Sequence, residues 1–363
     1  MSARSYLAIA AAVVLVLLVA SLTLAWRAHA SGISVTADPH VQDAYWKTRI
    51  EAIGGKAAYA EFALAIAQLD PGQQHQEAHL FGKALYEAEG IKGVSTCDVR
   101  FSYGCFHEFM GRAIAALGIG VVGQLNDSCR QTLGPDFLAC QHGIGHGLIA
   151  YLGYDEASLE KSLDICASLP YSDPIGGCPG GAFMEYNLRT ILQGEGDASA
   201  SIRAEDPSDP FAPCDSLQSA YQASCYFWQV QWWDQTGKQK GETIDARFAQ
   251  IGKWCATLSS ALARQCFQGL GNITPPEADF DGARSAALCD IATGDATDRL
   301  YCKSFAANSL FVGGAGEKGD AIAVCKGLSG NSYQYCAAYA SNKANIAVPI
   351  EVIMSDESAN RSP

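Results

Sequence analysis

The sequence lacks the motifs that mark several common classes of protein. It contains 14 cysteines, but no two of them form a CxxC pair, which argues against zinc ribbons and thioredoxin-type redox sites. No CxxCH is present for covalent c-type haem, and there is no glycine-rich phosphate loop or Lys/Arg cluster. Together with a formal charge of −13, these absences argue against nucleic acid as a partner.

Charged residues and strand patterns are also scarce. Charged residues make up 17% of the chain and hydrophobic residues 48%, a balance typical of a globular protein rather than a disordered one. The alternation of β-branched and polar residues that marks strands is rare, whereas the apolar runs keep helical spacing. The composition and pattern therefore predict an all-α fold.

A long apolar run stands at the N-terminus, at residues 6–26, and is long enough to span a bilayer as one helix. An A-x-A segment at residues 28–30 offers a cleavage site for a signal peptide. We therefore expect residues 1–30 to be a transmembrane signal-anchor, contacting the membrane through this helix, or a cleaved signal peptide. Either interpretation places the domain at residues 31–345 outside the cytosol, in the periplasm, at the cell surface or secreted. Residues 346–363 are expected to form a polar tail.

The cysteines show a tandem repeat. They fall into consecutive pairs whose members are 8 to 13 residues apart, and an even number in an exported chain predicts seven disulfides. The second cysteines recur every 34 to 47 residues, which is typical of helix-turn-helix repeats, and an insertion at residues 194–213, expected to be a polar surface loop, explains the longest step. We predict about seven to eight units, the first without cysteines and with helices at residues 59–69 and 75–87, forming a superhelix or a closed α/α ring. The predicted pairs are Cys97/Cys105, Cys129/Cys140, Cys166/Cys178, Cys214/Cys225, Cys255/Cys266, Cys289/Cys302 and Cys325/Cys336.

The segment CDVRFSYGC, from Cys97 to Cys105, resembles the disulfide-bridged members of the Sel1-like repeat proteins in its cysteine spacing. The resemblance extends to Cys336 in cysteine spacing only, because the leucine-glycine-tyrosine consensus of that family is absent. It implies successive helical hairpins that are stapled by disulfides.

Aligning the units on their second cysteines brings five of the seven histidines into register. His107 and His142 stand two residues after the second cysteine, and His146 stands six residues after it. His75 and His79, in the cysteine-free unit, have the same spacing of four, which places both members of a pair on one helix face. Because stacked repeats bring equivalent positions side by side, we predict that the five imidazoles form one patch.

This patch predicts a transition-metal site. Imidazole ligands suit zinc, copper or iron and do not suit calcium or magnesium. The candidate ligands are His75, His79, His107, His142 and His146. Glu185 is the best carboxylate candidate for a catalytic role. Glu77 lies two residues from each flanking histidine and points away from them on a helix, and Glu108, next to His107, can likewise face elsewhere.

Three glycines, Gly143, Gly145 and Gly147, interleave and follow the histidine pair in CQHGIGHGLIAY. Each costs a helix about 1 kcal/mol relative to alanine. We expect them to clear space for a bound species or for a closely packed helix.

The sequence leaves the function open between two classes. The first is a membrane-anchored helical-repeat protein with a histidine-rich metal site, in metal handling or metal-dependent catalysis. The second is a disulfide-rigidified scaffold that binds a peptide or an envelope protein, in which the histidines belong to a structural polar ring with Asn272, Asn308 and Asn342. Non-covalent haem held by two of the histidines is a third possibility.

Overall fold

The computed structural model is almost entirely helical in the part of the chain that it describes, which confirms the predicted all-α class. The predicted anchor at residues 1–30 and the predicted tail at residues 346–363 lie outside the described part. The structure describes residues 38–191, 201–206, 208–313 and 318–341.

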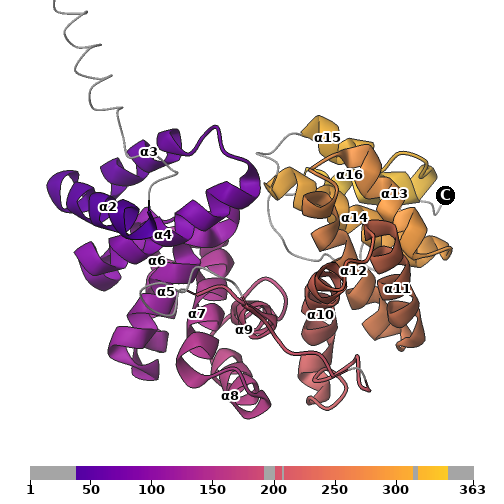
Figure 1. Ribbon diagram of the computed structural model, residues 1–363, viewed down its shortest axis with the longest axis horizontal. Helices are drawn as coiled ribbons and strands as arrows, with labels where there is room; N and C mark the ends of the chain where they lie inside the picture. The colour runs from indigo at the N-terminus through magenta and orange to yellow at the C-terminus, as the bar shows by residue number, and fades with distance from the viewer. Residues whose placement is uncertain (1–37, 192–200, 207, 314–317, 342–363) are drawn as a thin grey trace, which may run out of the picture.

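The helices form two halves, which are indigo to magenta and red to yellow in Figure 1. The N-terminal half contains α2 (Pro39–Ile53), α3 (Gly55–Ala65), α4 (Pro71–Glu89), α5 (Gly104–Leu117), α6 (Val122–Leu133), α7 (Phe137–Leu152), α8 (Glu156–Ala167) and α9 (Cys178–Asn187). The C-terminal half contains α10 (Ser219–Gln239), α11 (Ile244–Thr257), α12 (Ser260–Glu277), α13 (Gly282–Ala292), α14 (Ala296–Gly313), α15 (Lys318–Ala323) and α16 (Gly330–Tyr339). Short 3-10 turns are η1 (Gly90–Thr96), η2 (Phe101–Tyr103), η3 (Ile119–Val121) and η4 (Gly134–Asp136), and the two-residue strands β1 (Leu188–Arg189) and β2 (Ser201–Ile202) pair antiparallel.

One helix of each unit belongs to a continuous inner row. The inner helices α4, α5, α7, α9, α10, α12, α14 and α16 contact one another in that order, and the other helices pack on their outer side. The helices predicted at residues 59–69 and 75–87 correspond to α3 and α4, with α2 added before them. This successive packing is the arrangement expected of a helical repeat.

All seven predicted cysteine pairs form disulfides, and no cysteine is free. Most of them join an outer helix to the first turns of the next inner helix, as Cys129–Cys140 joins α6 to α7. Disulfides persist in oxidising compartments, so seven of them indicate an environment outside the cytosol.

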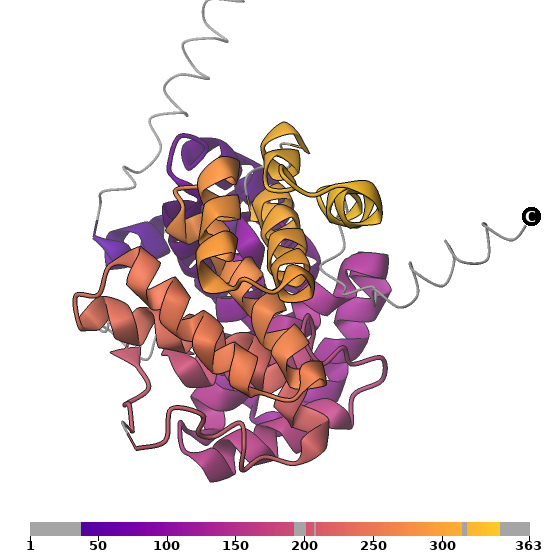
Figure 2. The ribbon, with the colours of Figure 1, turned by 90° about the vertical axis from the view of Figure 1, so that its right-hand side faces the viewer.

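The superhelix curls back on itself. The turn η2, from the first disulfide-bridged unit, contacts α14 in the sixth. Figure 2 shows the C-terminal helices lying in front of the N-terminal helices after a quarter turn of the view. The face of α4, α5 and α7 that carries the predicted histidines therefore lies inside the molecule.

The glycines of α7 bring helix backbones into contact. A Cβ atom at Gly145 would lie 2.0 Å from the Cys178 carbonyl oxygen of α9, and one at Gly143 would lie 2.6 Å from the Phe106 carbonyl oxygen of α5. From the other side, a Cβ at Gly181 of α9 would lie 1.9 Å from the His142 carbonyl oxygen. We expected these glycines to clear space either for a bound species or for a closely packed helix, and the structure shows close packing of helices.

Local sequence sets the ends of the histidine-bearing helices. Asp70 opens α4 with a capping box, in which its side chain accepts from the Gln73 backbone and the Gln73 side chain accepts from the Asp70 backbone. Gly118 and Gly153 end α5 and α7 with φ angles of 72° and 125°, which favour glycine.

Among the described residues, no single helix is both long and apolar enough to cross a bilayer. One bent pair of helical segments, Phe101–Leu117 with Ile119–Leu133, has sufficient length and composition.

Candidate metal centre

The five histidines predicted to share a patch lie together in the interior. His75 and His79 come from α4, His107 from α5, and His142 and His146 from α7. All but His75 are buried, with exposed fractions of 5% for His79, 1% for His107, 4% for His142 and 0% for His146. The partly exposed His75 is thus the edge of the cluster nearest to solvent.

The first group, which we call the α4 trio, consists of His75, His79 and His107. The Nε2 atom of His79 lies 3.2 Å from Nε2 of His75 and 3.3 Å from Nδ1 of His107. Nitrogens that bind one tetrahedral zinc ion at about 2.0–2.1 Å are about 3.3 Å apart. The spacing of these nitrogens therefore matches the edge of a metal coordination shell, and the trio could hold a metal ion.

The second group, the α7 trio, consists of His107, His142 and His146. The rings of His107 and His146 stack with centroids 4.1 Å apart, and the His142 ring lies 5.0 Å from His146 and 5.4 Å from His107. One ligand atom from each residue lies within 4.8 Å of the others, so this trio could also hold an ion. His107 belongs to both groups.

A backbone carbonyl orients His75. Its Nδ1 donates to the Phe101 carbonyl oxygen at 2.9 Å. Phe101, Ser102 and Tyr103 all have positive φ angles, of 56°, 48° and 69°, which non-glycine residues rarely adopt. Strain of this kind persists only where surrounding structure imposes it, and here it accompanies a carbonyl aimed at a histidine.

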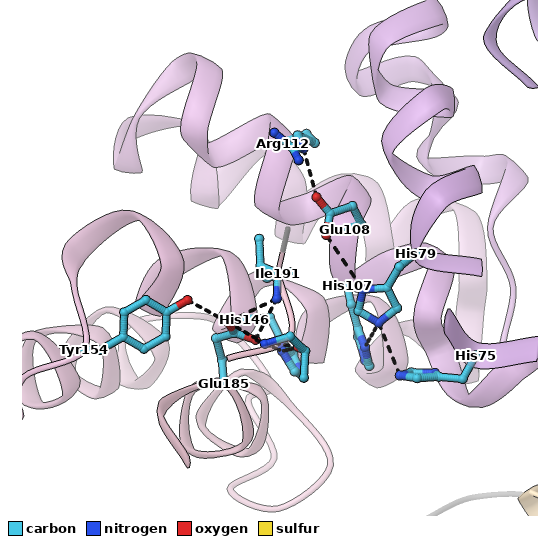
Figure 3. A network of polar contacts seen from close by, with 10 residues as sticks. His75, His79, His107, Glu108, Arg112, His146, Tyr154, Glu185 and Ile191 are labelled. Carbon is cyan, nitrogen blue, oxygen red and sulfur yellow. Dashed lines mark hydrogen bonds and ion pairs between the residues drawn. The ribbon is translucent and has the colours of Figure 1, made fainter. Parts of the chain in front are cut away.

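A carboxylate stands behind His79. Oε2 of Glu108 lies 3.7 Å from Nδ1 of His79, and Arg112 donates to Oε1 of Glu108 at 2.9 Å (Figure 3). Glu108 is fully buried. Glu108 adjoins His107 in the sequence of α5, but it contacts the cluster through His79 of the adjacent helix α4.

Glu185 stands behind His146. The Nδ1 atom of His146 donates to Oε2 of Glu185 at 2.9 Å, and both residues are fully buried. The carboxylate also accepts from Tyr154 Oη at 2.7 Å, from Thr190 Oγ1 at 2.6 Å and from the Ile191 backbone at 3.2 Å. Donors thus surround both oxygens, and Figure 3 shows Glu185 on the far side of His146 from the other histidines. This arrangement suits a positioning role better than the predicted catalytic one.

Desolvation keeps several of the rings neutral. Burial, together with a smaller effect of nearby histidines, lowers the pKa of His75 and that of His146 to about 3. Burial also places the pKa of His107 and that of His142 well below the usual value, although a hydrogen bond to the Gly177 backbone raises the latter. Neutral imidazole is the form that binds a metal ion.

The outward hydrogen bonds determine which ring nitrogens lack a proton. A carbonyl or carboxylate oxygen only accepts, so Nδ1 carries the proton in His75 and in His146, and Nε2 is unprotonated in both. The Nε2 of His146 is buried without a hydrogen-bond partner. When His79 directs its Nδ1 proton at Glu108, its unprotonated Nε2 faces that of His75 at 3.2 Å. Two lone pairs at this distance repel, and a bound cation would turn the repulsion into attraction.

Several parts of the centre could not be found from the sequence. The Phe101 carbonyl, the Gly177 backbone and Tyr154 all come from loops or helix ends, where the repeat alignment has no fixed position. Only the Glu108–Arg112 pair had a local signal, a spacing of four on one helix. Trp228 of α10 also reaches the cluster, and its ring centroid lies 5.5 Å from that of His142.

Comparison with known protein families, with curated proteins and with solved structures finds no match. The resemblance to Sel1-like repeats in cysteine spacing therefore stays a prediction.

Proposed function

We propose that this protein binds a transition-metal ion (zinc, copper or iron) in its histidine cluster and works outside the cytosol, anchored by its N-terminal segment. The observation that carries the proposal is the convergence of ring nitrogens from His75, His79 and His107, which lie 3.2 and 3.3 Å apart. Hydrogen bonds on the outer side of the rings support it, because metal-ligating histidines generally donate their second N–H to a carboxylate or carbonyl. His75 and His146 have such acceptors in Phe101 and Glu185, and Glu108 lies 3.7 Å from Nδ1 of His79.

The burial of the cluster favours a resident ion over one that is passed on quickly. A hydrolytic metal site needs an open coordination position that water and substrate can reach. Here four of the five rings are at most 5% exposed, and the fifth, His75, is only partly exposed. We therefore place metal-dependent redox chemistry or structural metal binding ahead of metal transport and hydrolysis. The close packing of the rings on one another also disfavours haem.

Metal analysis of the purified full-length chain tests the proposal. We expect at least one equivalent of zinc, copper or iron, either as purified or after reconstitution with the metal salt. His79→Ala should lower the metal content, because it removes a ligand of the α4 trio. His40→Ala is the matched control, since His40 is exposed on α2 and belongs to neither trio. Less than about half an equivalent in the parent protein, unchanged by His79→Ala, would refute metal binding and favour the peptide-binding scaffold.

A further inference from the structure

His107 differs from the other four histidines in what surrounds its ring. His75, His79, His142 and His146 each have one nitrogen directed at a group outside the cluster: a carbonyl, a carboxylate or the Gly177 backbone. In the described structure, His107 Nδ1 faces His79 Nε2 at 3.3 Å and His107 Nε2 is buried without a partner. Both nitrogens of His107 are thus left to the cluster.

His107 lies between the two trios, where both of its ring nitrogens could bind a metal ion. Figure 3 shows His107 between His79 on one side and His146 on the other. The α4 trio lies on the Nδ1 side of the ring, and the His107 ring stacks on His146 of the α7 trio. A ligand to one ion needs only one nitrogen, and its other nitrogen normally has an outside acceptor. His107 has none in the described residues, and it is the single member that the two groups share.

We propose that the cluster holds two metal ions, one in each trio, and that His107 bridges them through its two ring nitrogens. This inference rests on the proposed function and goes further by assigning the nuclearity of the centre. Binding the second ion requires His107 to lose its remaining N–H proton, which passes to the solvent. The ring then carries one negative charge between the two cations.

One buried acid lies beside each trio. Glu108 lies beside the α4 trio through His79, and Glu185 lies beside the α7 trio through His146. Both carboxylates are fully buried. Arg112 is paired with Glu108, whereas Glu185 has no lysine or arginine partner among the described residues, and an unpaired buried charge is costly. A single ion in the α4 trio would leave Glu185 and His146 without a cation, and it would leave the buried Nε2 of His146 unpartnered.

Copper reconstitution of the full-length chain tests the bridge, with Cu²⁺ alone as the probe. We expect the metal-free protein to take up two Cu²⁺ ions per chain. The integrated electron paramagnetic resonance (EPR) signal should fall well below the copper content, because an imidazolate bridge couples the two unpaired spins antiferromagnetically. His75→Ala and His142→Ala, which each remove a ligand from one trio only, should each leave one copper ion with its full signal. His40→Ala should behave like the parent protein.

The failures of the two proposals are distinguishable. One bound copper ion that is lost in His79→Ala would overturn the second ion while keeping the proposed metal site. Two ions with the full EPR signal would overturn the bridge. Failure to bind copper would overturn the two-copper centre, and failure to bind zinc and iron as well would overturn both proposals. Thermal unfolding of His75→Ala and His142→Ala without metal verifies that each variant is folded. The copper content and EPR signal of the parent protein test the proposal even if a variant does not fold.

Discussion

At Gly145 the backbone of α7 meets the backbone of α9 with no room for a side chain. A Cβ there would lie 2.0 Å from the Cys178 carbonyl oxygen and 2.5 Å from the Ala182 nitrogen. Since neither backbone atom can rotate away, we expect Gly145→Ala to force the helices apart and lower the free energy of unfolding by about 1–3 kcal/mol or more. Urea unfolding of the metal-free protein measures this change.

The matched control is Gly123, which lies in α6, where a Cβ atom would have nothing within 4 Å of it. Gly123→Ala should leave stability unchanged or raise it by up to about 1 kcal/mol, because alanine favours the helix. Equal effects of the two substitutions would mean that helix propensity, and not the backbone contact between α7 and α9, governs Gly145.

Replacing Glu185 tests whether a hydrogen bond on the side of a ring away from the cluster positions that histidine as a ligand. In Glu185→Gln the amide can donate to Nδ1 of His146, which would move the ring proton to Nε2 and block the nitrogen that faces the cluster. We expect a loss of about 10- to 100-fold in metal affinity. Competition with a chelator measures it, with Glu160→Gln, at an exposed position of α8, as the control. An affinity that is unchanged in Glu185→Gln would show that Glu185 does not position a ligand.

At the scale of the elements, the sequence predicts the units better than their contacts. The cysteine period reveals the hairpins because a disulfide requires both cysteines to be close, and the offset from the second cysteine reveals the inner face of α5 and α7. The rotation of one helix against the next depends on which backbones approach, as at Gly145 and Gly181. That rotation brings Glu185 to His146, 39 residues earlier in the chain, so only the structure could identify this pair.

The disulfide between α6 and α7 offers a test at this scale. Cys140 stands two residues before His142, so its bond to Cys129 fixes the start of a ligand-bearing helix. Replacing both cysteines with alanine should lower the free energy of unfolding by about 2–3 kcal/mol and should also weaken metal binding. Chemical unfolding and chelator competition measure the two effects.

The matched control removes Cys289–Cys302, which joins α13 to α14 and encloses a loop of similar length. Its loss should destabilise the protein by a similar amount and leave metal affinity unchanged, because no histidine of the cluster lies on these helices. Equal loss of metal in both double variants would mean that the centre depends on global stability and not on the anchoring of α7.

At the scale of the whole molecule, the apolar interior consists of two clusters. One extends from Trp46 in α2 to Cys178 at the start of α9, and the other extends from Ile149 in α7 to Ala340 after α16. Every histidine of the centre lies on α4, α5 or α7, so the ligands belong to the N-terminal half alone. Ions bound in the two trios would therefore link three inner helices at one end of the superhelix.

Metal removal should accordingly affect the two halves differently. A ligand present at about 1,000 times its dissociation constant stabilises the state that binds it by about 4 kcal/mol. In a repeat array that stabilisation acts first on the units that touch the ligand, because each unit contacts mainly its neighbours. Hydrogen exchange should therefore become faster in α4, α5 and α7 when a chelator removes the metal, while α12, α13 and α14 change little. His79→Ala, which removes a ligand of the α4 trio, should show a smaller chelator effect in α4, α5 and α7 than the parent protein. Faster exchange throughout the parent protein would instead show that the curled superhelix opens as one cooperative unit, with the contact between η2 and α14 transmitting the loss.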